Sequence, residues 1–446
     1  MESILILHLI IAIVLALFII IRLKQSAFLA LFVSTLYYGL AAGMDLSTIV
    51  KTIGDGFGGT MRGIGLVIGF GVLIGQLLAD CGGVTSIVNG FLRVVSKRRV
   101  PEALTATGLV VSTPVFFDVG FVILAPIARR LARLTELPLA ITLGSLVIGL
   151  GTAHMLIPPT PGPLAVADAL KVPLALMIVG GALVGIPGAF LALLAYRSIL
   201  KYLRWAPEND EEPIAIEREV EVKMPPFGLA IIPIALPIIL ICLASIIPII
   251  LGKEVGIAGK ILLFLGARDI AMFLGAIVAM GVATRTMDRA AIARSVGTAI
   301  SSAGIILLIT AVGGSFGAVL QASGIGKIFG TTLGAQISPL LAILLAWGIA
   351  AGIKAAQGSG TVAIITTSQL MAPIAPYIAL NPLWLAVAIG SGGLLGCHVN
   401  DSGFWVVAKT GGLSVRGGLK VYTVSTAINA ITTLIFLLLF QAFLFR

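Results

Sequence analysis

Apolar segments long enough to cross a lipid bilayer recur along the whole chain, and they are the feature that most constrains its fold. About 20 consecutive apolar residues cross a bilayer as an α-helix. Charged residues make up only 11% of the 446 residues, whereas a soluble globular protein carries about 25%. So few charges cannot cover a water-soluble surface. Ten segments have the length and composition of membrane spans: roughly 3–22, 27–44, 61–79, 136–157, 173–199, 226–250, 268–284, 296–318, 382–399 and 421–445.

Two further apolar stretches, at about 102–128 and 337–376, are interrupted near their middles by polar residues and glycines. We expect each to enter and leave the membrane on one side as a re-entrant hairpin. The Lys and Arg residues occur in short groups between apolar segments, as basic residues in cytoplasmic loops do. Placing these groups in the cytoplasm predicts an all-α polytopic protein of the inner or plasma membrane, with ten spans and both termini outside. The net charge of +10 is spread over these loops and does not indicate a nucleic-acid partner.

A weak internal repeat divides the chain into two halves. Residues 75–83 resemble residues 317–325 at a separation of 242 positions, and residues 162–167 resemble residues 403–408 at a separation of 241. One half contains five spans, and an odd number makes the second copy cross the membrane upside down. Inverted repeats are common in secondary transporters, whose sites lie at the repeat interface. We therefore expect two inverted repeats of five spans, each with a re-entrant hairpin and a broken helix: a first membrane repeat in 1–200, a polar cytoplasmic linker in 201–225 and a second repeat in 226–446.

A proline-rich run interrupts the predicted span 136–157 at its end. Residues 158–163 read PPTPGP, and a helix cannot continue through them because proline lacks an amide donor and clashes with preceding carbonyls. Non-helical backbone within a membrane is tolerated only where it is buried in protein or lines a polar cavity. The freed amides and the helix N-terminus beyond Gly162 then favour an anion, with Thr160 beside them. A loop outside the membrane is the alternative, and the matching break at Asn400 and Ser402 argues against it.

The second hairpin carries the sequence QGSGT in residues 357–361. Gly358 and Gly360 permit a tight turn, because glycine adopts positive φ at little cost. Ser359 and Thr361 then present hydroxyls next to bare amides, which suits carboxylate and polyol oxygens. The alternative is a close helix crossing, which small residues also permit. Lys354 lies in the same hairpin and is expected either to attract an anion or pair with a carboxylate, or to extend to the membrane surface.

Two carboxylates and two histidines lie in the apolar segments. Burial favours the neutral form of Asp118 and Asp401, as a proton carrier requires, and ionisable residues within a membrane are functional candidates. His154 and His398 precede the two helix breaks and join the carboxylates as candidates for proton coupling. The alternatives are structural: a helix cap for Asp401, a hairpin hydrogen bond for Asp118, and buried donors for the histidines.

Four of these segments resemble motifs of the gluconate permease family. They are FFDVGFVIL in 116–124, H-x-x-x-PP-x-PGP from His154, GSGTVA in 358–363 and HVNDSGFW in 398–405, and the resemblance covers nearly the whole chain in the same order. The family consists of proton-coupled symporters for gluconate and related sugar acids, with some members acting on D-serine or other small hydroxy-acids. This chain has Asp118 where the family often has Glu, Thr160 where it often has His, and Lys354 where it often has Arg. The carboxylate and the cation are kept, whereas Thr160 replaces the histidine at a position where a sugar hydroxyl would be recognised.

The residues and the resemblance together imply a secondary active transporter, a proton symporter for gluconate or a related small sugar acid or hydroxy-acid. Sodium coupling is an alternative, because carbonyls at helix breaks can coordinate sodium, and D-serine and glycerate are alternative substrates. We expect no enzymatic activity, since the chain has no HExxH motif and no Ser-His elbow, and we expect no cofactor or metal. Beyond the substrate, the proton and the lipid bilayer, a homodimer is compatible with the sequence. The predicted substrate-binding residues are Phe116, Thr160, Gly162, Gly358, Ser359, Gly360, Thr361, Asn400 and Ser402; the predicted proton-coupling residues are Asp118, Asp401, His398 and His154; Lys354 is predicted to attract the anion.

Overall fold

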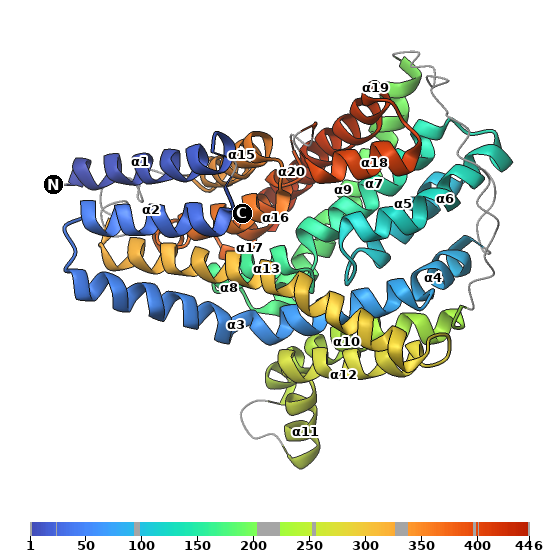
Figure 1. Cartoon of the computed structure of the whole chain (residues 1–446), viewed down its shortest axis with the longest axis horizontal. Helices are drawn as coiled ribbons and strands as arrows, with labels where there is room; N and C mark the ends of the chain where they lie inside the picture. Colours follow the sequence, from blue (N-terminus) through green and yellow to red (C-terminus); the bar gives the residue numbers. More distant parts are fainter. Residues whose placement is uncertain are drawn as a thin grey trace.

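The fold is all-helical throughout the residues that the computed structural model describes, which are 2–23, 25–92, 99–202, 224–251, 256–325, 338–395, 398–399 and 401–444 (Figure 1). The predicted helical class is therefore confirmed. The helices up to residue 202 are α1 (Glu2–Ile21), α2 (Ala27–Ala41), α3 (Leu46–Asp80), α4 (Gly83–Leu92), α5 (Val100–Val111), α6 (Phe117–Thr135), α7 (Leu139–Leu156), α8 (Pro161–Ala169) and α9 (Leu174–Tyr202).

The helices beyond residue 224 follow the same order of long, hairpin and broken elements. They are α10 (Phe227–Leu251), α11 (Ile257–Leu265), α12 (Arg268–Ala283), α13 (Arg289–Ala322), α15 (Pro339–Gln357), α16 (Gly360–Met371), the 3₁₀ turn η3 (Ala375–Tyr377), α17 (Pro382–Gly392), α18 (Ser402–Gly411), α19 (Val415–Gly418), the π-helical turn η4 (Leu419–Thr423) and α20 (Val424–Leu444). The linker expected at 201–225 lies almost wholly outside the described residues.

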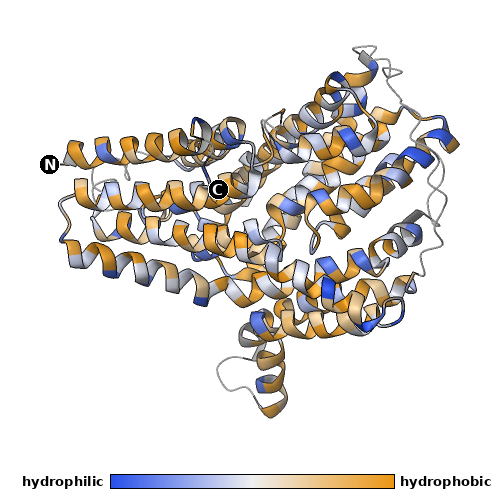
Figure 2. Cartoon of the chain, viewed as in Figure 1, coloured by the Kyte–Doolittle hydropathy of each residue, from blue (hydrophilic) through white to orange (hydrophobic). Residues whose placement is uncertain are grey.

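The helices have the length and the surface of a membrane bundle. Seven in the described ranges are long and apolar enough to cross a bilayer, or eight if α11 and α12, bent by 68°, form one span. Figure 2 shows hydrophobic residues along most of the helices. Large apolar side chains such as Ile257 and Phe443 are about four-fifths exposed, at 80% and 81%, as expected for contact with lipid. The protein is thus a multi-pass membrane protein. Each of the ten predicted spans overlaps a helix, although α17 ends at Gly392, well inside the span expected at 382–399. The count of ten stays a prediction.

Two long helices, α3 and α13, pack side by side in opposite directions (Figure 1). The Ser295 hydroxyl near the start of α13 donates to Asp80 at the end of α3 at 2.6 Å, and the Ser315 hydroxyl donates to the Ile53 carbonyl at 2.9 Å. Both helices are longer than the spans expected at 61–79 and 296–318. Each begins at an aspartate cap, Asp45 or Asp288, that accepts a first-turn amide; these caps extend the helices beyond their apolar segments.

The helix α7 is the centre of the bundle, because every residue from Thr142 to Leu156 is buried. A helix that is apolar on all sides is expected to lie inside a protein rather than at its surface. The hairpin helix α5 packs directly on it: a Cβ at Gly149 would lie 2.1 Å from the Thr105 carbonyl oxygen. The C-terminal end of α7, which carries His154, therefore lies deep inside the protein.

Two short helices, α4 and α11, were not expected from the apolar pattern. The bend between α11 and α12 occurs at Gly266, where a Cβ would lie 2.3 Å from both the Leu240 carbonyl oxygen and the Ala244 side chain of α10. Only glycine allows so close an approach between two helices without displacement.

Candidate functional site

A cavity of about 110 Å³ lies where the hairpin tip between α15 and α16 meets the ends of several other helices. Asp118 comes from the first turn of α6 and His154 from the last turn of α7. The residues of the hairpin tip and the first turn of α18 complete its polar wall. The polar residues that line this cavity are Asp118, His154, Lys354, Ser359, Thr361, Asp401, Ser402, Tyr422 and Thr426.

Three helix N-termini contribute to this cavity. They belong to α6, α16 and α18, and their caps are Phe116, Ser359 and Asp401. Ser359 and Asp401 cap their own helices, since their side-chain oxygens accept from the amides of Val362 at 3.4 Å and Gly403 at 2.9 Å. Phe116 has no side-chain oxygen to offer, so no side chain caps α6. The positive ends of three helix dipoles favour negative charge in the cavity.

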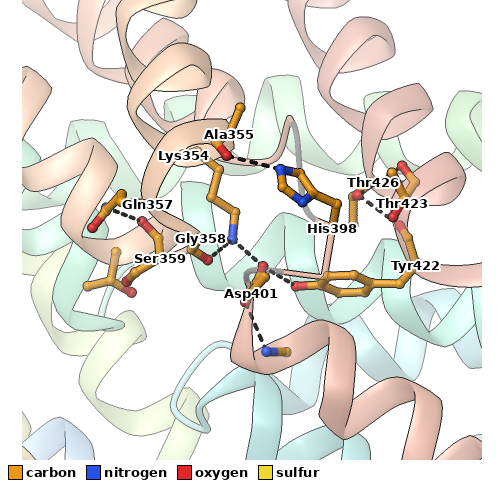
Figure 3. Close-up of polar contacts among 12 residues, drawn as sticks. Lys354, Ala355, Gln357, Gly358, Ser359, His398, Asp401, Tyr422, Thr423 and Thr426 are labelled. Atoms are coloured by element: carbon orange, nitrogen blue, oxygen red, sulfur yellow. Dashed lines mark hydrogen bonds and ion pairs between the residues drawn. The ribbon is translucent and has the colours of Figure 1, made fainter. Parts of the chain in front are cut away.

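A lysine, an aspartate and a tyrosine form a buried cluster on one side of the cavity (Figure 3). The side chains of Lys354 and Asp401 are 3% and 6% exposed and form an ion pair. The Lys354 ammonium also donates to the Gly358 carbonyl at 2.7 Å. The Tyr422 hydroxyl donates to the same Asp401 oxygen, Oδ2, at 2.9 Å. These contacts join α15, the hairpin tip, the start of α18 and the turn η4.

Asp118 and His154 face the cavity with fewer partners. Within the described residues, Asp118 accepts no hydrogen bond. His154 Nε2 lies 3.4 Å from the Thr361 hydroxyl. The other ring nitrogen, Nδ1, is buried and has no hydrogen-bond partner among the residues that the structure describes. The Phe116 ring meets the His154 ring edge-on, with 6.0 Å between centroids. A carboxyl group without a donor, beside a histidine, can exchange a proton without breaking a structural contact.

A second cavity of about 270 Å³ continues from the first toward α13. The two share Phe117, Asp118, His154, Ser359 and Thr361. The outer wall of the second cavity consists of apolar side chains, among them Ile305, Ile306 and Ile309 of α13. A bound molecule larger than the first cavity would therefore extend past His154 and Thr361 toward this wall.

The structure brings most of the predicted residues together. Those that line one or both cavities are Phe116, Asp118, His154, Lys354, Ser359, Gly360, Thr361, Asp401 and Ser402. Gly358 lies just behind them, in the left-handed region at φ 88°, where its carbonyl accepts from Lys354.

Three predicted residues occupy other places. The Thr160 hydroxyl donates to the carbonyls of His154 at 3.2 Å and Ile157 at 2.9 Å, and Thr160 lines neither cavity. Gly162 packs on α16, where a Cβ would lie 2.7 Å from Ile364. The His398 ring bonds to the Ala355 carbonyl at 3.0 Å, beside Lys354 but outside both cavities (Figure 3). Asn400 lies outside the described residues.

Two polar residues of the cavity were missed by sequence reasoning, Tyr422 and Thr426. They lie where η4 passes into α20, at the start of what reads as an ordinary apolar span from residue 421, so no local signal singles them out. No group of three or more His, Cys, Asp or Glu side chains in the described ranges is arranged to hold a metal ion.

A cavity lined by charged residues and helix ends, inside an all-helical membrane bundle, is what a multi-pass membrane transport protein requires. The chain belongs to the GntP family of permeases, whose sequence profile matches residues 4–443. The resemblance identified from the motifs is therefore confirmed. Because the family consists of permeases, the protein is a secondary permease and not an enzyme.

Several known proteins are similar to this chain over nearly its full length. The chain is 34% identical over 427 residues to a gluconate permease of Pseudomonas aeruginosa, covering 94% of this chain and 93% of the relative. It is 32% identical over 425 residues to the Gnt-II system L-idonate transporter of Escherichia coli, covering 94% and 95%. Its fold is similar to that of the YdaH transporter of Alcanivorax borkumensis, with a TM-score of 0.62 and 14% identity over 90% of this chain and 89% of that one.

Proposed function

We propose that the protein is a secondary active transporter, a proton symporter, for a small organic acid: gluconate or a related sugar acid or hydroxy-acid. The observation that carries this proposal is the convergence of three helix N-termini on one cavity, beside the Lys354–Asp401 ion pair. Helix N-termini favour an anionic group. The relatives named for gluconate and L-idonate support the same class of substrate.

The substrate would bind with its carboxylate at the hairpin tip and its hydroxyl groups along the opposite wall. Ser359, Gly360 and Thr361 offer amides and hydroxyls at the tip, and Ser402 offers the same at the start of α18. Phe116 and His154 would face the carbon chain. Asn400 is assigned to the site from the sequence, while Thr160 and Gly162 support it from behind, through the backbone next to His154 and through the packing of α8 on α16.

The coupling of proton and substrate would follow from charge. An ionised Asp118 next to a bound carboxylate is a pair of like charges, whose repulsion is strong where water is scarce. A proton on Asp118 removes that repulsion, so the proton and the anion stabilise each other's binding. This is the condition for symport, because the doubly loaded site is then favoured over either singly loaded one.

The proposed architecture is a pair of inverted repeats of five spans, with a first repeat in 1–200, a linker in 201–225 and a second repeat in 226–446. The antiparallel pair α3 and α13 supports it, since these helices are 35 and 34 residues long and both begin at an aspartate cap. Gly82 and Gly324, which follow their C-termini, have matching positive φ angles of 75° and 79°. The hairpins α5–α6 and α15–α16 and the broken helices α7–α8 and α17–α18 follow in the same order.

Uptake into proteoliposomes tests the proposal. An inward proton gradient should drive accumulation of radiolabelled gluconate, a protonophore should abolish it, and unlabelled L-idonate, glycerate and D-serine should be compared as competitors. Accumulation driven by a sodium gradient, with no response to the protonophore at clamped voltage, would replace the proton by sodium. Failure of every acid in this panel to be bound or transported would refute the assigned substrate class.

A further inference from the structure

We propose that Tyr422 is a positioning residue: its hydroxyl, together with Lys354, holds the Asp401 carboxylate against the hairpin tip and away from the bound anion. The inference rests on the proposed function, because it concerns an anionic substrate that shares the cavity with Asp401.

The contacts of Asp401 place three donors on one carboxylate. Oδ1 accepts from the Gly403 amide at 2.9 Å, which caps α18. Oδ2 accepts both from the Lys354 ammonium and from the Tyr422 hydroxyl, the latter at 2.9 Å. These three donors fix the direction of the Asp401 carboxylate, and the Lys354 ammonium pairs with it. Without the Tyr422 hydroxyl, Oδ2 would lose one of the two donors that fix its direction.

The backbone and the packing around Tyr422 direct its hydroxyl to this point. Tyr422 lies in the π-helical turn η4, which begins α20, and π turns are frequent at functional sites. The ring packs against those of Phe117 and Phe404, with centroids 5.6 and 6.3 Å away. A second tyrosine, Tyr196, donates to the Lys420 carbonyl of the same turn at 3.3 Å, and so supports its wider geometry.

The close approach of Tyr422 also requires a glycine at the start of α18. A Cβ at Gly403 would lie 2.6 Å from the Tyr422 hydroxyl oxygen, which is closer than side chains pack. The first turn of α18 is therefore shaped to receive this hydroxyl, and the contact with Asp401 is part of how the helix begins.

The two carboxylates of the cavity consequently have different roles. Asp401 has three donors, whereas Asp118 accepts no hydrogen bond within the described residues. The ionisable groups that face Asp118 across the cavity are His154, Lys354, Asp401 and Tyr422. Of the two acids, Asp118 alone can take up and release a proton without breaking a contact between helices, so the coupling proton is assigned to Asp118.

A double-mutant cycle tests whether Tyr422 acts through Asp401. Tyr422→Phe keeps the ring and removes only the hydroxyl. We expect it to weaken gluconate binding about tenfold, because the Asp401 carboxylate loses the donor that holds it away from the bound anion. In an Asp401→Asn background the same substitution should change affinity less than about twofold, because the oxygen it positions is no longer charged. If Asp401→Asn does not fold, Asp401→Ser keeps a capping oxygen for α18 and supplies the background.

The matched control is Tyr38→Phe, since Tyr38 is equally buried and its hydroxyl bonds to Ser323 at 3.1 Å, away from both cavities. Its effects should be the same in both backgrounds. The cycle is also measured as the melting temperature of the substrate-free protein. If wild type binds no gluconate, the assigned substrate fails, and the melting cycle still tests the contact. An equal effect of Tyr422→Phe in both backgrounds, or no effect in wild type, would overturn the proposal.

Discussion

Substitution of Lys354 by glutamine should destabilise the protein severely, because it leaves a buried carboxylate without its counter-ion. Lys354 and Asp401 are both almost fully buried, with side-chain exposures of 3% and 6%. Removing one partner of a buried ion pair costs roughly 3–5 kcal/mol. Asp401 keeps its donors from Tyr422 and Gly403, which favours the lower end, while the Gly358 carbonyl loses a donor worth about 1 kcal/mol. We expect the free energy of unfolding to fall by about 3–4 kcal/mol.

The assay is equilibrium unfolding in mixed micelles, with Lys51→Gln as the control. Lys51 lies on the exposed side of α3, and Lys and Gln have similar helix propensities, so the control should change stability by less than about 0.5 kcal/mol. Adding Asp401→Asn to Lys354→Gln removes the unpaired charge and should recover more than half of the loss. Equal stability of Lys354→Gln and Lys51→Gln would refute the reasoning, since it would mean that Asp401 carries no charge in the folded protein.

Four further outcomes are expected. Asp118→Asn should abolish proton-driven accumulation while counterflow exchange of gluconate persists, because an amide cannot release a proton; continued accumulation against a gradient would exclude Asp118 as the sole carrier. Thr361→Ala should weaken gluconate binding at least about tenfold in calorimetry, the cost of a lost hydrogen bond to a charged group, and unchanged affinity would remove the hairpin tip from the site. Gly149→Ala should lower the free energy of unfolding by about 1–3 kcal/mol, since its Cβ would lie 2.1 Å from a backbone carbonyl of α5, whereas the Cβ of Gly151→Ala meets only a side chain at 3.4 Å; equal unfolding free energies would contradict this. Single cysteines in residues 205–225 should be labelled by an impermeant reagent only after the cells are opened, and labelling of intact cells would reverse the topology.

The sequence predicted the elements that physical chemistry fixes locally. Proline at 158, 159 and 161 ends α7 at Leu156 and starts α8 at Pro161, because proline cannot continue a helix but is favoured in its first turn. Gly358 adopts the positive φ that the hairpin turn needs. Apolar length predicted helices at the expected spans. The ionisable residues in apolar segments predicted a shared site, and Asp118, His154, Lys354 and Asp401 do line one cavity, while its function stays a prediction.

The positions where helices begin, and the hydrogen-bond partners of polar side chains, could not be predicted from the sequence. The apolar pattern reports where lipid contacts begin, and it does not report where a capping residue starts a helix; α3 and α13 consequently begin at Asp45 and Asp288, well before their apolar segments. The sequence suggests that the Thr160 hydroxyl is available to a ligand, yet this hydroxyl donates to the His154 and Ile157 carbonyls at the proline break. The folded structure alone shows which polar side chains bond to the backbone and which are available to a ligand.

The placement of Tyr422 shows why a site of this kind depends on distant segments. The first turn of α18 supplies one donor to Asp401, the Gly403 amide. The other two donors come from distant segments: Lys354 of α15 and Tyr422 of η4. Lys354 also holds the hairpin tip, since its ammonium donates to the Gly358 carbonyl. A movement that separates α15 from α18 would therefore expose an unpaired carboxylate and release the tip together, because both depend on one ammonium group. An anion bound between the tip and α18 would add to the contacts that already join α15 to the start of α18, among them the Lys354–Asp401 ion pair and the bond from the His398 ring to the Ala355 carbonyl.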